Sequence, residues 1–201
     1  MIPLRGWVAV AVLWCVTSAA ALAQGGAPAA MPARATSGTS AGAGEPRSTS
    51  ADGAALLAAR PLRFPVEGFE ANELKDTFDD GRPGHRHEAL DIPAPRGTRV
   101  IAVDDGPLVR LFTSKPGGLT IYQFDPSGRL AYYYAHLDRY ADGLQEGKAL
   151  KRGDLIGYVG TTGNAPPDAP HLHFAVFRLG PEKQWWKGEA LNPYQALRQA
   201  R

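Results

Sequence analysis

Short apolar runs alternate with tight turns between residues 98 and 177, and this alternation limits the folds that the chain can adopt. The runs are rich in β-branched and aromatic residues, which favour strands, and the Gly, Pro, Asp and Asn residues between them favour turns. Short strands joined by tight turns pair in antiparallel fashion. The sequence therefore predicts an all-β protein, a compact antiparallel sandwich or barrel with short peripheral helices. The predicted strands cover residues 98–103, 108–112, 119–124, 130–134, 155–159 and 172–177.

The first 60 residues lack this alternation and divide into two parts. Residues 1–23 hold one charge, Arg5, and then an apolar segment that ends in small residues before Gln24, which predicts a secretory signal peptide. The alternative is an uncleaved membrane anchor, since about 18 apolar residues can just span a bilayer. Residues 24–50 contain no Val, Ile, Leu or aromatic residue and cannot bury enough apolar surface to fold. We predict a signal peptide at 1–23, a disordered Ala/Pro/Gly/Ser-rich linker at 24–60 with a short helix possible over 51–60, and a folded domain at 61–201.

Charge and cysteine content exclude several functional classes. The formal net charge is +2 and falls to +1 when Arg5 leaves with the signal peptide, so no basic field for nucleic acid is expected. Cys15 is the only cysteine and lies inside the predicted signal, so the mature chain would have no disulfide and no thiolate chemistry. These features predict a periplasmic or secreted protein with no stable membrane span after signal cleavage.

Four of the five histidines and one aspartate stand in three motifs that are far apart in the chain: His87 with Asp91, His136, and His171 with His173. Side chains alternate along a strand, so His171 and His173 share one face of the last predicted strand. Prolines close behind Asp91 argue against a helix, so His87 and Asp91 have to converge through a loop that enters a strand. Catalytic zinc usually takes three protein ligands and leaves the fourth position to water. Two histidines and an acid would fill that set, and the remaining two histidines would move protons or stabilise negative charge.

Four sequence motifs surround these histidines and the loop before the last predicted strand. They are His-Glu-Ala-Leu-Asp-Ile-Pro-Ala-Pro-Arg-Gly-Thr at 87–98, Tyr-Ala-His-Leu at 134–137, Gly-Tyr-Val-Gly-Thr-Thr-Gly-Asn at 157–164 and His-Leu-His-Phe at 171–174. In these motifs and their order the chain resembles the lysostaphin/LytM-type zinc metallopeptidases. The resemblance covers roughly residues 65–197 and implies a compact β-sandwich core, the duplicated hybrid motif, and cleavage of peptide cross-links in bacterial cell walls.

The resemblance assigns a role to each of the five residues. His87, Asp91 and His173 match the three ligands of Zn²⁺. His136 and His171 match the two histidines that do not bind the metal but act on the activated water and the developing oxyanion. Which of these two is the base stays open in the sequence.

Three residues near the first motif need separate comment. Ala89 stands where the family usually has glycine, which adds a methyl group without removing a ligand. His85 lies outside the family pattern and is predicted to be a bystander near the rim of the site. Glu88 neighbours a ligand but is not part of an HExxH motif, which the chain lacks, so a solvent-facing side chain is predicted.

The predicted function is hydrolysis of peptide cross-links by a secreted zinc endopeptidase, with peptidoglycan stem peptides as its partners. The alternative within the same fold is a non-catalytic protein that binds the cell wall or activates an amidase, but such proteins typically lose metal ligands. A cupin-type metalloenzyme would need a glutamate and a second histidine motif that are missing, and a lipoyl or biotinyl carrier would need a lysine with the right flanking residues in a tight turn. The same ligands would serve a cross-link between D-alanine and a diamino acid or a pentaglycine bridge, so the bond stays open.

Overall fold

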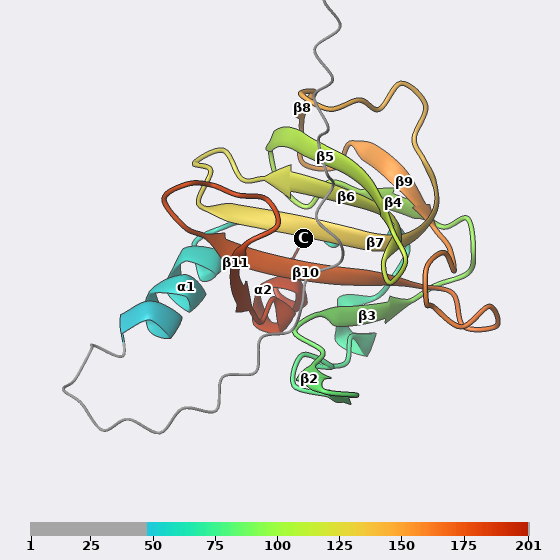
Figure 1. Cartoon of the computed structure of the whole chain (residues 1–201), viewed down its shortest axis with the longest axis horizontal. Coiled ribbons are helices and arrows are strands. Elements are labelled where there is room, and N and C mark those ends of the chain that lie inside the picture. The colour runs from blue at the N-terminus through green and yellow to red at the C-terminus, as the bar shows by residue number, and fades with distance from the viewer. Residues whose placement is uncertain (1–47, 201) are drawn as a thin grey trace, which may run out of the picture.

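The computed structural model describes residues 48–200, so the predicted signal peptide and most of the predicted linker lie outside the described residues. Within this range no helix is long and apolar enough to cross a bilayer. The elements (Figure 1) are α1 (Ser48–Ala58), the 3-10 helix η1 (Ala71–Glu73), β1 (Gly81–Arg82), β2 (His85–Arg86), β3 (Leu90–Pro93), β4 (Arg99–Ile101), β5 (Gly106–Ser114), β6 (Gly118–Phe124), β7 (Leu130–Tyr140), β8 (Ala149–Leu150), β9 (Leu155–Val159), β10 (His171–Leu179), β11 (Gly188–Leu191) and α2 (Tyr194–Arg198).

Nine of the strands form one antiparallel sheet, which confirms the predicted all-β class. β5, β6, β7 and β10 run side by side across the molecule in Figure 1. β7 pairs with β10 and β6 over its first part and with β9 from Leu137 onward. On its other edge β10 pairs with β3 through residues 171–174 and with β11 through residues 176–179. All six predicted strands are present, and β10 lies at the junction of β3, β7 and β11.

Alternation along β10 separates the core from the side of the sheet that carries the histidines. Leu172, Phe174 and Val176 are fully buried, whereas His171 and His173 stay partly exposed on the opposite face. This confirms the predicted facing of the strand. Burial of apolar surface stabilises the fold by about 25 cal/mol per Å². This gain fixes the register of β10, because a shift by one residue would bring the histidines into the core.

Helix α1 lies N-terminal of the predicted domain start at residue 61, and part of the segment predicted as linker is packed in this structure. Helix α1 packs against the sheet, and its Leu57 is 2% exposed and belongs to the hydrophobic core. Gly53 permits this close approach, because a Cβ there would lie 2.5 Å from a methyl carbon of Leu191. The Arg60 side chain then donates hydrogen bonds to the buried Asp104. The sequence did not indicate this packing, because residues 24–50 have few large apolar side chains and α1 needs only a few to pack against the sheet.

Replacing Leu57 with alanine is expected to lower the free energy of unfolding by about 2–4 kcal/mol, because a buried leucine loses its transfer free energy and leaves a cavity. The neighbouring Leu56 is the matched control, since its side chain is only partly buried against the same core. Leu56→Ala is expected to cost less than half as much. Denaturant unfolding of both variants measures the difference, and equal small losses would contradict the docking of α1.

Candidate metal centre

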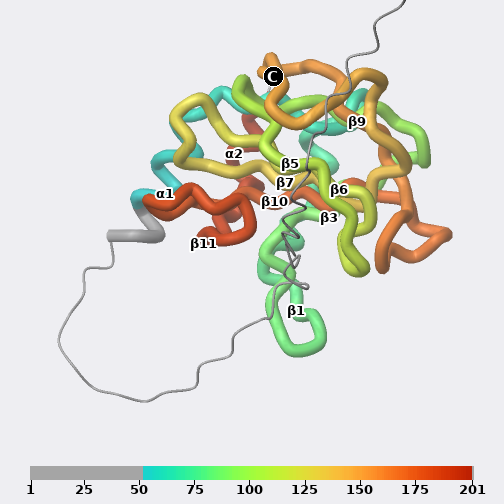
Figure 2. The backbone as a smooth tube through the Cα atoms, turned by 45° about the horizontal axis from the view of Figure 1, so that its top comes forward, coloured from blue at the N-terminus to red at the C-terminus, as the bar shows by residue number. Residues whose placement is uncertain are grey.

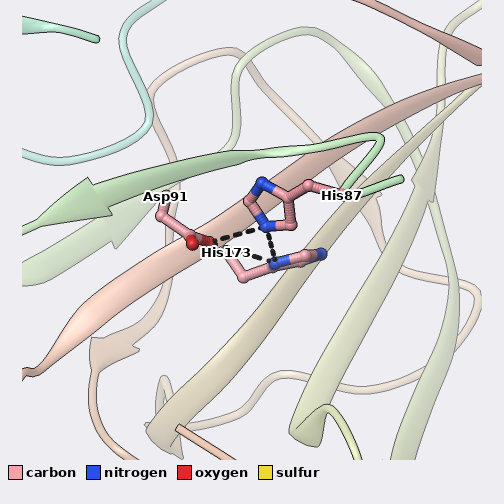
Figure 3. A group of neighbouring side chains, drawn as sticks. All are labelled: His87, Asp91 and His173. Atoms are coloured by element: carbon pink, nitrogen blue, oxygen red, sulfur yellow. Dashed lines mark hydrogen bonds and ion pairs between the residues drawn. The ribbon is translucent and has the colours of Figure 1, made fainter. Parts of the chain in front are cut away.

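Three side chains from two distant parts of the chain point toward one another at β10 (Figure 3). His87 Nε2 lies 3.1 Å from His173 Nδ1 and 3.1 Å from Asp91 Oδ1. His173 Nδ1 lies 3.2 Å from the same Asp91 oxygen. The three atoms therefore form a nearly equilateral triangle. The structure thus brings together the three residues that the sequence predicted as metal ligands.

Strand pairing explains how these residues meet. β3 pairs with β10 in a register that sets Asp91 directly opposite His173. His87 precedes β3, and the chain between His87 and Asp91 turns through Glu88, whose φ of 55° is left-handed. This turn brings the His87 side chain back over Asp91, as predicted from the prolines that follow. Glu88 itself is exposed, in agreement with its predicted orientation toward solvent.

Thr77 holds the first two residues of the triangle in place. Its backbone carbonyl lies 2.9 Å from His87 Nδ1 and its hydroxyl accepts a hydrogen bond from the Asp91 backbone N–H. A carbonyl oxygen can only accept a hydrogen bond, so Nδ1 carries the proton and Nε2 presents its lone pair to the triangle. Orientation of a ligating histidine by a second hydrogen bond of this kind is a regular feature of metal sites.

The triangle fits a zinc ion in donor type and in size. Two imidazole nitrogens and one carboxylate oxygen are a ligand set of catalytic zinc sites. Zinc bonds of about 2.0–2.2 Å in a tetrahedron place neighbouring ligand atoms about 3.3–3.6 Å apart. The observed separations of 3.1–3.2 Å are slightly shorter, so a small outward movement of the side chains would bring them into this range.

His136 lies beside the triangle at a break in β7. Its φ of 60° is left-handed, at the point where β7 exchanges β10 for β9 as its partner. Its Nδ1 lies 2.8 Å from the carbonyl oxygen of Thr162, so Nδ1 carries the proton and the lone pair is on Nε2. The hydroxyl of Thr162 accepts from the Leu119 N–H and donates to the Leu137 carbonyl. Thr162 therefore ties the loop before β10 to two strands and fixes the tautomer of His136.

A backbone carbonyl also fixes His171 in the tautomer that has its proton on Nδ1. Its Nδ1 lies 2.9 Å from the Ala169 carbonyl oxygen, and its Nε2 lies 3.6 Å from Asp91 Oδ1. The rings of His136 and His171 have centroids 4.9 Å apart and meet edge to face. The structure thus places both histidines predicted as non-ligands next to the triangle, each with a lone pair on Nε2.

The electrostatics favour an ionised carboxylate at Asp91 and neutral imidazoles at His136 and His173. Burial disfavours the charge on Asp91, but hydrogen bonds and attraction from His173 and His87 outweigh it and hold the pKa of Asp91 well below its usual range. Burial lowers the pKa of His136 to about 4, although its hydrogen bond to Thr162 opposes that change. Burial likewise lowers the pKa of His173 against the opposing effect of Asp91. A charged carboxylate and neutral imidazoles are the protonation states that bind metal ions and accept protons.

The five residues line one open cleft of about 690 Å³. Tyr133 also lines it, with its ring 6.0 Å from that of His173, while Tyr132 and Tyr134 on either side of it are fully buried. His85 stands on the exposed β2 and lines the cleft outside the triangle. Thr77, Thr162 and Arg82 were not found from the sequence. Thr77 and Thr162 orient the two histidines through their backbone carbonyls, which every residue has and which leave no sequence signal.

Fold and site together have the features of a metallopeptidase built on an antiparallel sheet. The profile of Peptidase family M23 matches residues 85–193, which is more than half of the chain. The chain therefore belongs to this family, and the resemblance to the lysostaphin/LytM-type peptidases is confirmed.

Individual relatives agree with the family assignment. The L-Ala–D-Glu endopeptidase of Bacillus subtilis is 31% identical over 143 residues, which are 67% of this chain and 42% of the relative. The LytM protein of Ruminococcus gnavus has a similar structure, with a TM-score of 0.58, 28% identity and coverage of 72% of this chain and 62% of that one. The catalytic domain of lysostaphin from Staphylococcus simulans gives a TM-score of 0.51 with 26% identity, over 72% of this chain and 96% of that domain. This chain spans less than half the length of the Bacillus relative.

Proposed function

We propose that this protein is an exported zinc endopeptidase that hydrolyses peptide cross-links of bacterial peptidoglycan. The observation that carries the proposal is the triangle of His87, Asp91 and His173 with two further histidines of fixed tautomer in the same cleft. Membership of Peptidase family M23 supports the reaction class. The signal peptide predicted at residues 1–23 supports a periplasmic or secreted location, where stem peptides are the available partners.

Each residue has a part in the proposed reaction. His87, Asp91 and His173 would hold the zinc ion, which when bound acidifies a water molecule and polarises the scissile carbonyl. His136 and His171 present Nε2 toward the same cleft. One would accept the proton of the attacking water and deliver it to the leaving amine, and the other would stabilise negative charge on the carbonyl oxygen.

A non-catalytic role in cell-wall binding or amidase activation is the second candidate. It requires that the domain bind its partner without metal chemistry. The presence of all three donors and both histidines favours the enzyme. A protein that only binds the cell wall has no need to gather five such groups in one cleft and to orient their rings by hydrogen bonds.

Zinc removal tests the proposed function directly. Chelation is expected to abolish release of cross-linked muropeptide fragments from purified sacculi, and one equivalent of zinc is expected to restore it. Zinc content by elemental analysis and fragment release by chromatography are the two measurements. A folded protein that takes up no zinc and releases no fragments would support the binding role instead, and release that survives complete zinc removal would contradict the metal mechanism.

A further inference from the structure

Arg82 places a guanidinium group at the rim of the candidate metal centre. It belongs to β1, which pairs with β2 in a small hairpin whose residues 81–86 are all exposed. Figure 2 shows β1 projecting from the body of the domain. Arg82 Nη2 donates a 2.8 Å hydrogen bond to Asp91 Oδ2. The other carboxylate oxygen, Oδ1, faces the two histidines of the triangle, so Asp91 connects Arg82 to the site without giving up its donor atom.

Few charged side chains line the cleft beside this guanidinium group. Among the described residues that line it, Arg82 is the only Lys or Arg and Asp91 is the only Asp or Glu. Their charges cancel, so a divalent cation held by the triangle would make the cleft net positive. Such a cleft attracts anionic peptides.

The geometry of Arg82 suits a second carboxylate. A guanidinium group has five N–H donors, and the bond to Asp91 is the only hydrogen bond that this one makes within residues 48–200. The side chain is 39% exposed, so its remaining donors are accessible to a ligand. Because Asp91 already orients the guanidinium plane, the Arg82 side chain would lose little further conformational entropy when a ligand binds its remaining N–H donors.

We propose that Arg82 recognises a free carboxylate of the substrate and directs this site to acidic stem peptides rather than to glycine bridges. This inference rests on the proposed function. Stem peptides carry carboxylates on D-glutamate and on diamino acids such as diaminopimelate, whereas a glycine bridge has none along its length. Arginine pairs with carboxylates through short, charge-assisted hydrogen bonds that a neutral amide does not match.

A pair of peptide ligands and three variants test the recognition. The first ligand is the stem tetrapeptide L-Ala-γ-D-Glu-diaminopimelyl-D-Ala, and the second is the same peptide with its carboxylates amidated. The zinc-loaded protein is expected to bind the acidic peptide about tenfold more tightly than the amidated one. Arg82→Gln is expected to bring that ratio close to one, and Arg82→Lys to restore part of it. Calorimetry measures the affinities, and elemental analysis shows that each variant keeps its zinc.

Arg86 is the matched control on the same hairpin. It pairs with Asp79 at 2.9 Å, as Arg82 pairs with Asp91, but it does not line the cleft. Arg86→Gln is therefore expected to leave the ratio of the two affinities unchanged. A ratio that stays high in Arg82→Gln would overturn the proposal, as would equal weakening of both peptides, which would mean that Arg82 acts only through Asp91.

Hydrolysis separates this inference from the proposed function. On cross-linked fragments with free carboxylates, Arg82→Gln is expected to raise KM about tenfold with little change in kcat. Cleavage of acidic and amidated fragments at equal kcat/KM by the unaltered protein would overturn the recognition and leave the endopeptidase intact. Preferential binding of the acidic peptide without any cleavage would uphold the recognition and overturn the proposed function.

Discussion

Replacing His173 with alanine is expected to abolish stoichiometric zinc binding and peptide hydrolysis together while the domain stays folded. The substitution removes one corner of the triangle and leaves two protein ligands where catalytic zinc usually has three. Loss of a partner outside the ligand set already costs about 10–100-fold in metal affinity, so loss of a ligand is expected to cost more. The backbone pairing of β10 with β3 and β7 does not depend on this side chain. Zinc content after dialysis and muropeptide release measure the two losses.

His85 provides the control for this substitution. It lines the same cleft, but it lies outside the triangle, and within residues 48–200 the one hydrogen bond of its side chain joins Nδ1 to the carbonyl oxygen of Pro83. His85→Ala is expected to keep one zinc per chain and the activity of the unaltered protein. Thermal unfolding adds a separate readout, because a ligand at about 100 times its Kd stabilises the folded state by about 2.7 kcal/mol. That gain is expected in His85→Ala and not in His173→Ala. Full zinc occupancy in His173→Ala would contradict the ligand set.

The sequence predicted the strands whose alternation is regular and missed those that depend on a partner. β10 was predictable because three core residues alternate with polar or small ones, and burial of one face enforces that pattern. At β3 the sequence predicted a loop that enters a strand but gave no bounds for it, because Leu90–Pro93 is short and ends in proline. Its pairing with residues 171–174 of β10 stabilises it, and such long-range pairing has no local signature.

The candidate site was predictable in its residue types and not in its supports. Histidine and aspartate have side chains suited to metal binding, so their spacing carries information even when the motifs are far apart. The supports of His87 and His136 are the carbonyls of Thr77 and Thr162, and no sequence pattern distinguishes one carbonyl from another. Arg82 was missed for a different reason, because its role depends on a hairpin that folds back over Asp91.

Substitution of either histidine beside the triangle is expected to remove activity without removing zinc. Proton transfer by a positioned side chain contributes about 10²–10⁴-fold to the rate, so losses in this range are expected for His136→Asn and for His171→Ala. Asparagine is the better choice at position 136, because the backbone there has a φ of 60° and asparagine tolerates the left-handed region better than alanine. Single-turnover hydrolysis of a cross-linked fragment and zinc content are measured for each variant.

The double variant decides whether the two histidines act in one step. Groups that act as a unit show strongly non-additive losses, so His136→Asn combined with His171→Ala is expected to lose little beyond the more impaired single variant. Their ring centroids lie 4.9 Å apart and both present Nε2 to the cleft, which is the arrangement expected when one moves the proton and the other stabilises the charge that results. Losses that simply multiply would assign them to separate steps. Loss of zinc from either single variant would instead make that histidine a ligand and contradict its role beside the triangle.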